Sequence, residues 1–412
     1  MTPASDGRGR ANAPAPPPSA GRSRTHLQTA RELVPHVLTW LRRQDADEPL
    51  RTVAGWSMTT RSTLRHFLIV QGLAPRIADL VSASNAAVVP AGAEDTARWL
   101  AEQLAQSRVR AARFGEDLAA ILDGAASAGV AVMPMKGAVL AFARYREPGL
   151  RPMADLDLLV RPADEPRLHD VLVRVGYRLL DDADRRRHRT YGRPGDRVVA
   201  TESVHPDNPR KVEVHTGLFR SVWTDHAGVD LAPRLWSAVR HATLVGRPAL
   251  VPSDAAMLFD VASHATSHLV RGTGRVLHWV DVAELAADVE VLDDAFAELT
   301  YPVLALAARA LADDRLASRV AGLAPAAGAS LTRLAARVPL DDRAGLNLRG
   351  VNHERLGWWA SRWQHWRPNP WLVRLASPRL PVALAYGAYV AGVGASLARE
   401  ASRLARRRGP IA

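Results

Sequence analysis

Apolar residues in the first third of the chain follow a helical spacing. The segments TARELVPHVLTWLRR (29–43) and AEDTARWLAEQLAQSRVRAARFGEDLAAILDGAASAG (93–129) place apolar residues three and four positions apart, and the second segment ends in a glycine-containing stretch. This pattern predicts a helical N-terminal region over residues 25–129.

At residue 130 the pattern changes to that of short strands. VAVMPM (130–135) is an apolar run that ends at Lys136 and Gly137, after which GAVLAFARY returns to helical spacing. The loop REPGLRPM, recognised by its Pro and Gly content, leads to DLDLLV (155–160), which is typical of a strand. PADEPRLHDVLVRVGY predicts a helix that ends at Gly176.

Two further segments alternate between apolar and polar residues. RVVATESV (197–204) and RKVEVHTG (210–217) have the alternation of antiparallel strands. Together with the preceding elements they predict a compact α/β unit over residues 130–222.

The remainder of the chain has the spacing of helices again. PSDAAMLFDVASHATSHLV starts with a Ser-Asp capping signal, and RVLHWVDVAELAAD continues the pattern. We expect a helical C-terminal domain over 223–350, followed by a Trp-rich segment and a basic terminal helix over 351–412. Residues 380–398 carry no charge, but they consist largely of Ala and Gly, so a buried helix is favoured over a membrane-surface helix, and that over a membrane span.

Charge and composition narrow the class of protein. Of the net charge of +12, residues 1–24 hold +3 and residues 398–412 hold +4, so most of the excess lies in the tails. This distribution argues against a nucleic-acid groove. Residues 1–24 are rich in Pro, Ala, Gly and Ser, and we expect them to be disordered. The absence of cysteine excludes disulfides and thiolate metal sites.

The candidate chemistry lies on the two predicted strands that carry acidic residues. Asp155 and Asp157 share one face of the first strand, as do Glu213 and His215 on the second, because residues two apart point the same way. If the strands are neighbours, the three carboxylates converge and repel one another unless cations lie between them. The expected ion is Mg²⁺, with Mn²⁺ as its alternative, because all these carboxylate ligands are oxygens.

Lysine is rare in this chain, which makes the position of Lys136 informative. Of the 54 Lys and Arg residues only Lys136 and Lys211 are lysines. Gly137 allows a close approach of the backbone to a ligand, and the flexible ammonium of Lys136 suits a phosphate. A phosphate site beside metal carboxylates indicates phosphoryl or nucleotidyl transfer.

The stretches KGAVLAFARY, GLRPMADLDLLV and VEVHTGLF resemble the bacterial nucleotidyltransferase family of the polymerase-β-like superfamily. The resemblance covers roughly residues 25–310. It implies an α+β fold, a mixed sheet flanked by helices with helical N-terminal and C-terminal regions. It also implies Asp155, Asp157 and Glu213 as catalytic metal ligands, and Lys136 with Gly137 at the triphosphate of an NTP. Two departures from the wider superfamily are Ala138, where a Ser or Gly is usual, and Glu213, where Asp is more common.

Each of the other polar residues near these segments has two candidate roles. Arg144, Tyr145, Arg151 and His215 are candidates for nucleotide binding, with a surface or strand role as the alternative. His264 and His268 have the spacing of a two-histidine metal site that Asp281 would complete. Without an HExxH motif or thiolates, we favour a structural or substrate-pocket role for these histidines.

Three functions remain open from the sequence. The first is a cytoplasmic, Mg²⁺-dependent nucleotidyltransferase that moves a nucleoside monophosphate from an NTP to an acceptor and releases pyrophosphate. The second is a metal-dependent glycosyltransferase. The third is a catalytically degenerate module for binding or regulation, with peripheral membrane contact through residues 356–408. The sequence does not specify the acceptor, the preferred nucleotide or the oligomeric state.

Overall fold

The computed structural model describes residues 20–84, 89–181, 188–200, 204–220, 229–290, 292, 294, 297–348, 373 and 380–407. The Trp-rich segment and residues 1–19 lie outside these ranges. Residues 20–24 were predicted to be disordered, but their backbone forms the first turn of helix α1. Once a helix has formed, each added residue costs little, so α1 extends upstream of its apolar positions.

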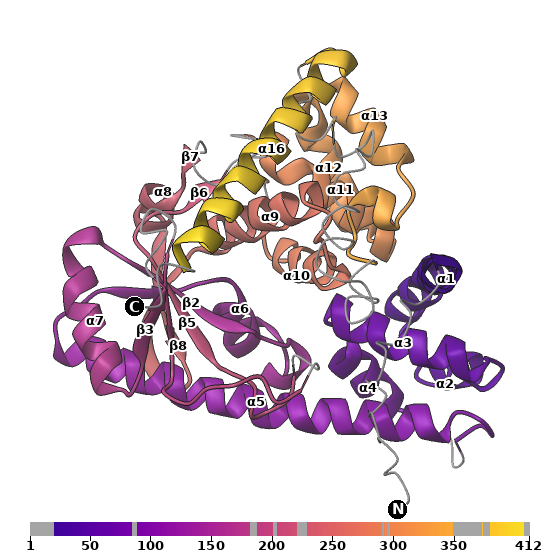
Figure 1. Ribbon diagram of the computed structural model, residues 1–412, viewed down its shortest axis with the longest axis horizontal. Helices are drawn as coiled ribbons and strands as arrows, with labels where there is room; N and C mark the ends of the chain where they lie inside the picture. Colours follow the sequence, from indigo (N-terminus) through magenta and orange to yellow (C-terminus); the bar gives the residue numbers. More distant parts are fainter. Residues whose placement is uncertain are drawn as a thin grey trace, which may run out of the picture.

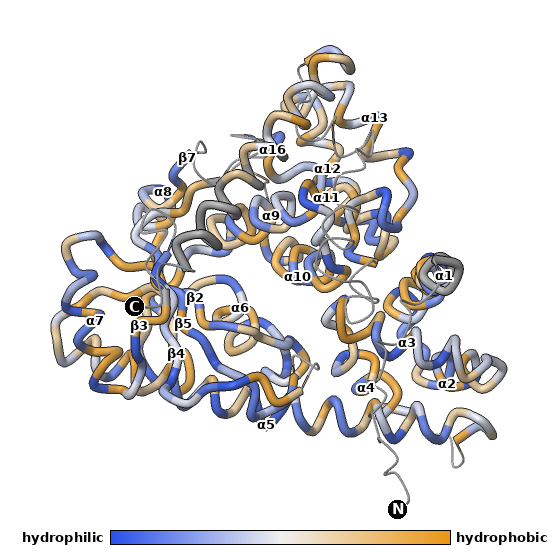
Figure 2. Tube along the Cα trace, viewed as in Figure 1, coloured by the Kyte–Doolittle hydropathy of each residue, from blue (hydrophilic) through white to orange (hydrophobic). Residues whose placement is uncertain are grey.

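The N-terminal part is helical, as predicted. Its helices are α1 (Ala20–Arg43), α2 (Glu48–Ala54), α3 (Met58–Gln71), α4 (Ala74–Ser82) and α5 (Glu94–Ser127). The 34-residue α5 runs from these helices along the sheet and so connects the two (Figure 1). Hydrophobic and hydrophilic positions alternate along it in Figure 2, as expected for a helix with one buried side.

A mixed sheet of five strands follows, which confirms the predicted α+β fold. The strands lie in the order β1-β2-β5-β4-β3, with β2 and β5 parallel and the other pairs antiparallel. They are β1 (Val132–Pro134), β2 (Asp155–Val160), β3 (Arg178–Asp181), β4 (Arg189–Gly192) and β5 (Lys211–His215). The helices of this unit are α6 (Lys136–Val139), a π-helical turn at Leu140–Arg144, and α7 (Glu165–Arg174).

One predicted strand is wrong. The described residues of the RVVATESV segment, 197–200 and 204, form no strand. The amides of Val199 and Ala200 donate instead to Asn208 Oδ1, and Asn208 Nδ2 donates back to the Ala200 carbonyl. A single asparagine side chain therefore satisfies backbone groups that a neighbouring strand would otherwise have paired.

The predicted helical C-terminal region begins later than expected. Between residues 229 and 252 the chain forms β7 (Val229–Asp230), which pairs with β6 (Phe219–Arg220), then α8 (Ala232–Ser237) and a hairpin of β8 (Val239–Leu244) and β9 (Arg247–Pro252). Val245 and Gly246 connect the hairpin with positive φ angles of 48° and 74°. Two positive φ angles define the tight turn that matches the twist of antiparallel strands.

The helices after the hairpin form the C-terminal part, above the sheet in Figure 1. They are α9 (Asp254–Val270), α10 (Val276–Ala286), α11 (Ala297–Leu311), α12 (Asp314–Ala327), α13 (Ala329–Arg337) and α16 (Val382–Arg407). Ser253 caps α9 by accepting from the Ala256 amide, as the Ser-Asp signal predicted. On α16, Ala385 and Tyr389 are buried whereas Leu384 and Val390 are exposed, so this helix is packed on one side. No helix among the described residues has an apolar stretch long enough to cross a bilayer.

Candidate active site

The predicted acidic residues meet where β2 and β5 run side by side. In the parallel register Asp155 lies opposite Lys211, and Asp157 lies opposite Glu213. Hydrogen bonding between these strands therefore places three carboxylates on one face of the sheet, because both strands present alternate residues to it.

A buried arginine on α5 bonds to the backbone just before both of these strands. Arg110 donates to the carbonyl oxygens of Met153 at 3.1 Å, Asn208 at 2.8 Å and Pro209 at 2.9 Å. Met153 precedes β2 and Pro209 precedes β5 by two residues. Burial lowers the pKa of Arg110 to about 10, which leaves its guanidinium charged at neutral pH. The geometry of the carboxylates thus depends on one side chain of a helix.

Asp157 is the centre of a buried chain of polar contacts. Lys136 Nζ donates to Asp157 Oδ1 at 2.6 Å, and His215 Nε2 lies 2.8 Å from the same oxygen. Lys136 and Asp157 are each 7% exposed and His215 is 5% exposed. The predicted phosphate ligand and the predicted metal ligand are therefore direct partners in this structure.

These contacts affect the two aspartates in opposite directions. Burial raises the pKa of Asp155 to about 7, and repulsion from Asp157 and Glu213 adds to the rise. Burial acts on Asp157 as well, but the cations and donors next to it, Lys136 and His215, outweigh burial and lower its pKa. Burial also lowers the pKa of His215 to about 4, so its imidazole is neutral at physiological pH. Asp155 thus has less cationic compensation than Asp157.

The turn after β1 is strained at Lys136 and crowded at Gly137. Lys136 has a φ of 45°, in the left-handed region that non-glycine residues seldom adopt. A Cβ atom at Gly137 would lie 3.2 Å from Arg151 Cζ and closer still to Arg151 Nη1. Glycine is therefore required at residue 137 for the guanidinium of Arg151 to lie against the turn.

Arg151 and Tyr145 connect this turn to the C-terminal helices. Arg151 Nη2 donates to Asp281 Oδ2 at 2.9 Å, and the Tyr145 hydroxyl donates to Asp281 Oδ1 at 2.8 Å. Arg144 points elsewhere, since it pairs with Asp288 at 2.6 Å and with Asp254. Of the three candidates, Arg151 is close enough to Asp155 for its charge to act on that carboxyl. Tyr145 and Arg144 contact aspartates outside the carboxylate group.

The two histidines of α9 lie in a separate polar cluster. His268 Nε2 is 3.1 Å from His264 Nε2, and His268 Nδ1 is 2.9 Å from Thr273 Oγ1. The ring of His278 lies beside that of His268, with 5.1 Å between centroids. Asp281, the third ligand suggested by the spacing, faces Arg151 and Tyr145 instead.

Two residues near the carboxylates were not singled out from the sequence. His188, next to β4, lies 3.6 Å from Glu213 through its Nε2 atom. Arg275, immediately before α10, keeps an accessible side chain. The surrounding protein lowers the pKa of Arg275, whereas the charge of Asp155 raises it, so the two charged groups interact. In so arginine-rich a chain, no sequence pattern distinguishes Arg275 from its neighbours.

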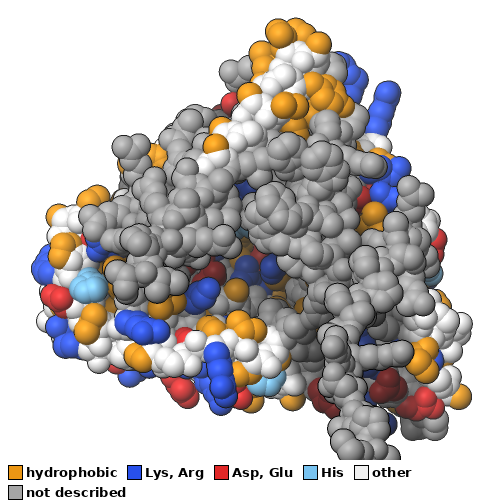
Figure 3. All heavy atoms as spheres, in the orientation of Figure 1, with side chains coloured by type: hydrophobic (Ala, Val, Ile, Leu, Met, Phe, Trp, Pro, Cys, Tyr) orange, Lys and Arg blue, Asp and Glu red, His pale blue; other side chains and the backbone are white. Residues whose placement is uncertain are grey.

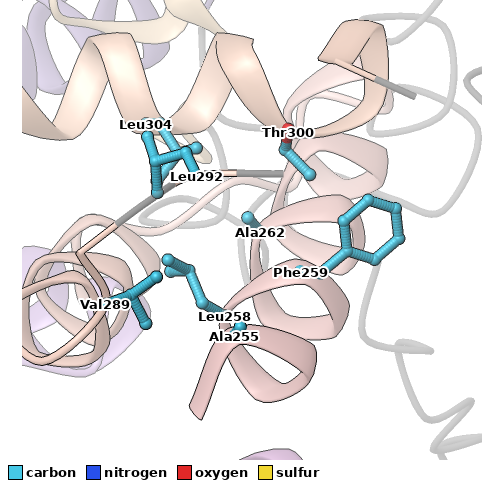
Figure 4. Close-up of a pocket in the computed structure, with 8 residues that line it drawn as sticks. All are labelled: Ala255, Leu258, Phe259, Ala262, Val289, Leu292, Thr300 and Leu304. Carbon is cyan, nitrogen blue, oxygen red and sulfur yellow. The ribbon is translucent and has the colours of Figure 1, made fainter. Parts of the chain in front are cut away.

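Charged side chains lie together on the surface (Figure 3), whereas the cavity between α9 and α11 is apolar. Figure 3 shows Lys, Arg, Asp and Glu side chains close together in the middle of the face turned to the viewer. A cavity between α9 and α11, drawn in Figure 4, is lined by apolar side chains and Thr300. Its lining has no titratable group, so it does not suit a phosphate or a metal ion.

The sequence of this chain matches a known protein family. A family model described as an uncharacterised nucleotidyltransferase matches residues 59–300, more than half of the 412 residues. The chain belongs to this nucleotidyltransferase family. The match includes every residue of the carboxylate group and the turn at Lys136, and it extends through α9 and α10. The family description gives nucleotidyl transfer as the activity and names neither substrate nor acceptor.

Other comparisons give more distant results. The solution structure of the antibiotic-resistance factor ANT(2'')-Ia is similar at 16% identity over 52% of this chain and 96% of that one, with a TM-score of 0.31. No curated protein matches the chain.

Proposed function

We propose that this nucleotidyltransferase moves a nucleoside monophosphate from an NTP to an acceptor and releases pyrophosphate, with Mg²⁺ as its metal. The observation that carries the proposal is the register of β2 and β5, which brings Asp155, Asp157 and Glu213 together beside a buried lysine. Such a face combines ligands for a divalent cation with a positive charge for phosphate.

The donor set fits a divalent cation. Asp155 is half-buried beside two other carboxylates, and its pKa is raised by desolvation and by repulsion from them. Asp155, Asp157 and Glu213 would hold the ion, and all three offer the oxygen ligands that Mg²⁺ prefers. When bound, the ion would supply charge stabilisation for the reacting phosphate oxygens.

Lys136 and Arg151 supply the positive charge on the phosphate side. Lys136 can exchange part of its contact with Asp157 for a phosphate oxygen, since its flexible stem allows the ammonium to move. Arg151 is held by Asp281 and lies against Gly137, so it offers a fixed charge at the same turn. The strained backbone at Lys136 is consistent with a position selected for ligand contact.

The reaction itself is a displacement at the α-phosphorus. The acceptor oxygen forms a bond to that phosphorus, the bond to the bridging oxygen of the β-phosphate breaks, and pyrophosphate leaves with the electron pair. The hydroxyl proton leaves during the attack, and a carboxylate of this site is suited to accept it.

Calorimetry with each NTP in the presence of Mg²⁺ tests the proposal. The wild type should bind at least one NTP, and the Asp155→Ala/Asp157→Ala variant should not. Asp170→Ala is the matched control, because Asp170 is an exposed aspartate on α7. Absence of NTP binding to the wild type with any divalent metal would refute the proposal, and a preference for nucleotide-sugars would favour a glycosyltransferase.

A further inference from the structure

Two histidines and Glu213 form a group of ligand atoms that adjoins Asp157. His188 precedes β4, and Glu213 and His215 lie on β5, which pairs with β4. Each of the three residues offers a ligand atom, and these atoms lie within 4.8 Å of one another. The strand pairing, not a flexible loop, thus brings Glu213 and His215 to this place.

The distances are close to those that a shared metal ion requires. His188 Nε2 lies 3.6 Å from Glu213 Oε1, and His215 Nε2 lies 3.9 Å from Glu213 Oε2. Two ligands bound to one tetrahedral ion with bonds of about 2.1 Å are roughly 3.4 Å apart. The ligand atoms of His188 and His215 are at most 4.8 Å apart, so movements of up to about an ångström would bring all three atoms to a common ion.

The ligand chemistry differs from that of the aspartate pair. Imidazole nitrogens suit borderline metals such as Zn²⁺, Co²⁺ and Ni²⁺, whereas Mg²⁺ and Mn²⁺ prefer oxygen ligands. His215 lies between the two groups of ligands, because its Nε2 donates to Asp157 Oδ1 at 2.8 Å, and an ion bound at this nitrogen would replace that hydrogen bond. A metal ion held by the histidines would therefore lie next to the proposed nucleotide site.

We propose that His188, Glu213 and His215 form a second cation site, specific for a borderline transition metal. This site shares Glu213 with the proposed Mg²⁺ site. The shared residue is the only point at which it rests on the proposed function. It would make the protein dependent on two kinds of metal, one at the aspartates and one at the histidines. The matched family model provides no such assignment.

Titration of Co²⁺ into the full-length protein without nucleotide tests this proposal. We expect saturable binding with the visible absorption of a nitrogen- and oxygen-ligated Co²⁺ ion. His188→Ala should weaken the apparent affinity at least about tenfold. His169→Ala is the matched control, since this half-buried histidine on α7 is bonded to the Tyr191 hydroxyl, away from Glu213. Excess Mg²⁺ should not displace the Co²⁺.

Two outcomes would overturn the proposal. One is equal Co²⁺ affinity in the wild type and in His188→Ala, including no binding by either; the other is displacement of Co²⁺ by an equal concentration of Mg²⁺. Pulsed EPR of the wild type with Cu²⁺ needs no variant, and it should show coupling to imidazole nitrogens. Asp155→Asn should keep the Co²⁺ site while losing nucleotidyl transfer. A chain that binds Co²⁺ through His188 but transfers no nucleotide would therefore contradict the proposed function alone.

Discussion

Lys136 combines an unfavourable backbone conformation with a buried ammonium group. Its φ of 45° is strained for a residue with a side chain, and its ammonium lies 2.6 Å from Asp157. A small, mobile cation can contact both the carboxylate and an incoming phosphate, whereas a planar guanidinium needs fixed partners and more space. The chemistry of lysine, not charge alone, is what this position requires.

Lys136→Arg should therefore weaken NTP binding about tenfold or more although the charge is kept. Calorimetry with NTP and Mg²⁺ measures this effect. Lys211→Arg is the matched control, because Lys211 is exposed on β5 and should tolerate arginine. Equal NTP affinity of wild type and Lys136→Arg would mean that the rare lysine has no special role.

Asp155 should make the stability of the metal-free protein dependent on pH. Its carboxyl has a pKa raised by burial to about 7, so the unfolded chain ionises it at lower pH than the folded chain does. The free energy of unfolding therefore falls as pH rises from about 4 to about 7.

Asp155→Asn removes this contribution. The free energy of unfolding of the variant minus that of the wild type should increase by on the order of 3 kcal/mol as the pH rises from about 4 to about 8. Urea unfolding in the presence of a chelator measures it, and Mg²⁺ should reduce the difference. A difference that is independent of pH would show that the Asp155 carboxyl is not perturbed in the folded protein.

At the scale of elements, α5 aligns the two strands that carry the carboxylates. Arg110 reaches the carbonyls that precede both β2 and β5. Arg110→Lys would keep the charge but serve fewer of these carbonyls, and it should lower the free energy of unfolding by about 3 kcal/mol and weaken NTP binding. Arg113→Lys, one turn along and bonded to Pro206 and the exposed Asp207, should change stability by less than about 1 kcal/mol. Equal effects of the two variants in chemical unfolding would contradict this role for α5.

Much of the element pattern was predictable because it depends on local periodicity. The bounds of β2 agree with the predicted 155–160, and the predicted helix end at Gly176 has the positive φ that favours glycine. The β8–β9 hairpin was missed because its turn uses Val245, a residue that disfavours a positive φ. The strand predicted at 197–204 depended on alternation alone, and at the described residues Val199 and Ala200 hydrogen bonds to Asn208 take its place.

In the site, too, local pattern could be predicted and tertiary contacts could not. The acidic residues could be predicted to converge because strand alternation determines which side chains share a face. The place of His188 depends on the pairing of β4 with β5 and that of Arg275 on tertiary packing, and neither leaves a mark in local sequence.

At the scale of the whole molecule, the site lies where the sheet faces the C-terminal helices. Asp281 on α10 is 1% exposed and accepts from Arg151 and Tyr145, so it joins the two parts. Asp281→Asn should lower the free energy of unfolding by about 3 to 5 kcal/mol, because it leaves the buried Arg151 charge without its counter-ion. Asp288→Asn alters an exposed ion pair with Arg144 and should cost less than about 1 kcal/mol. Thermal or chemical unfolding that ranks the two variants equally would argue against this connection.

Label transfer from NTPs tests the central claim most directly. The full-length protein would be incubated with Mg²⁺, candidate acceptors and each NTP labelled at the α-phosphate, with γ-labelled NTP in parallel. The account predicts that α-label becomes attached to an acceptor and that Asp155→Ala/Asp157→Ala abolishes this transfer, whereas Asp170→Ala retains it. Transfer of the γ-label, or α-label transfer that persists without Asp155 and Asp157, would contradict it.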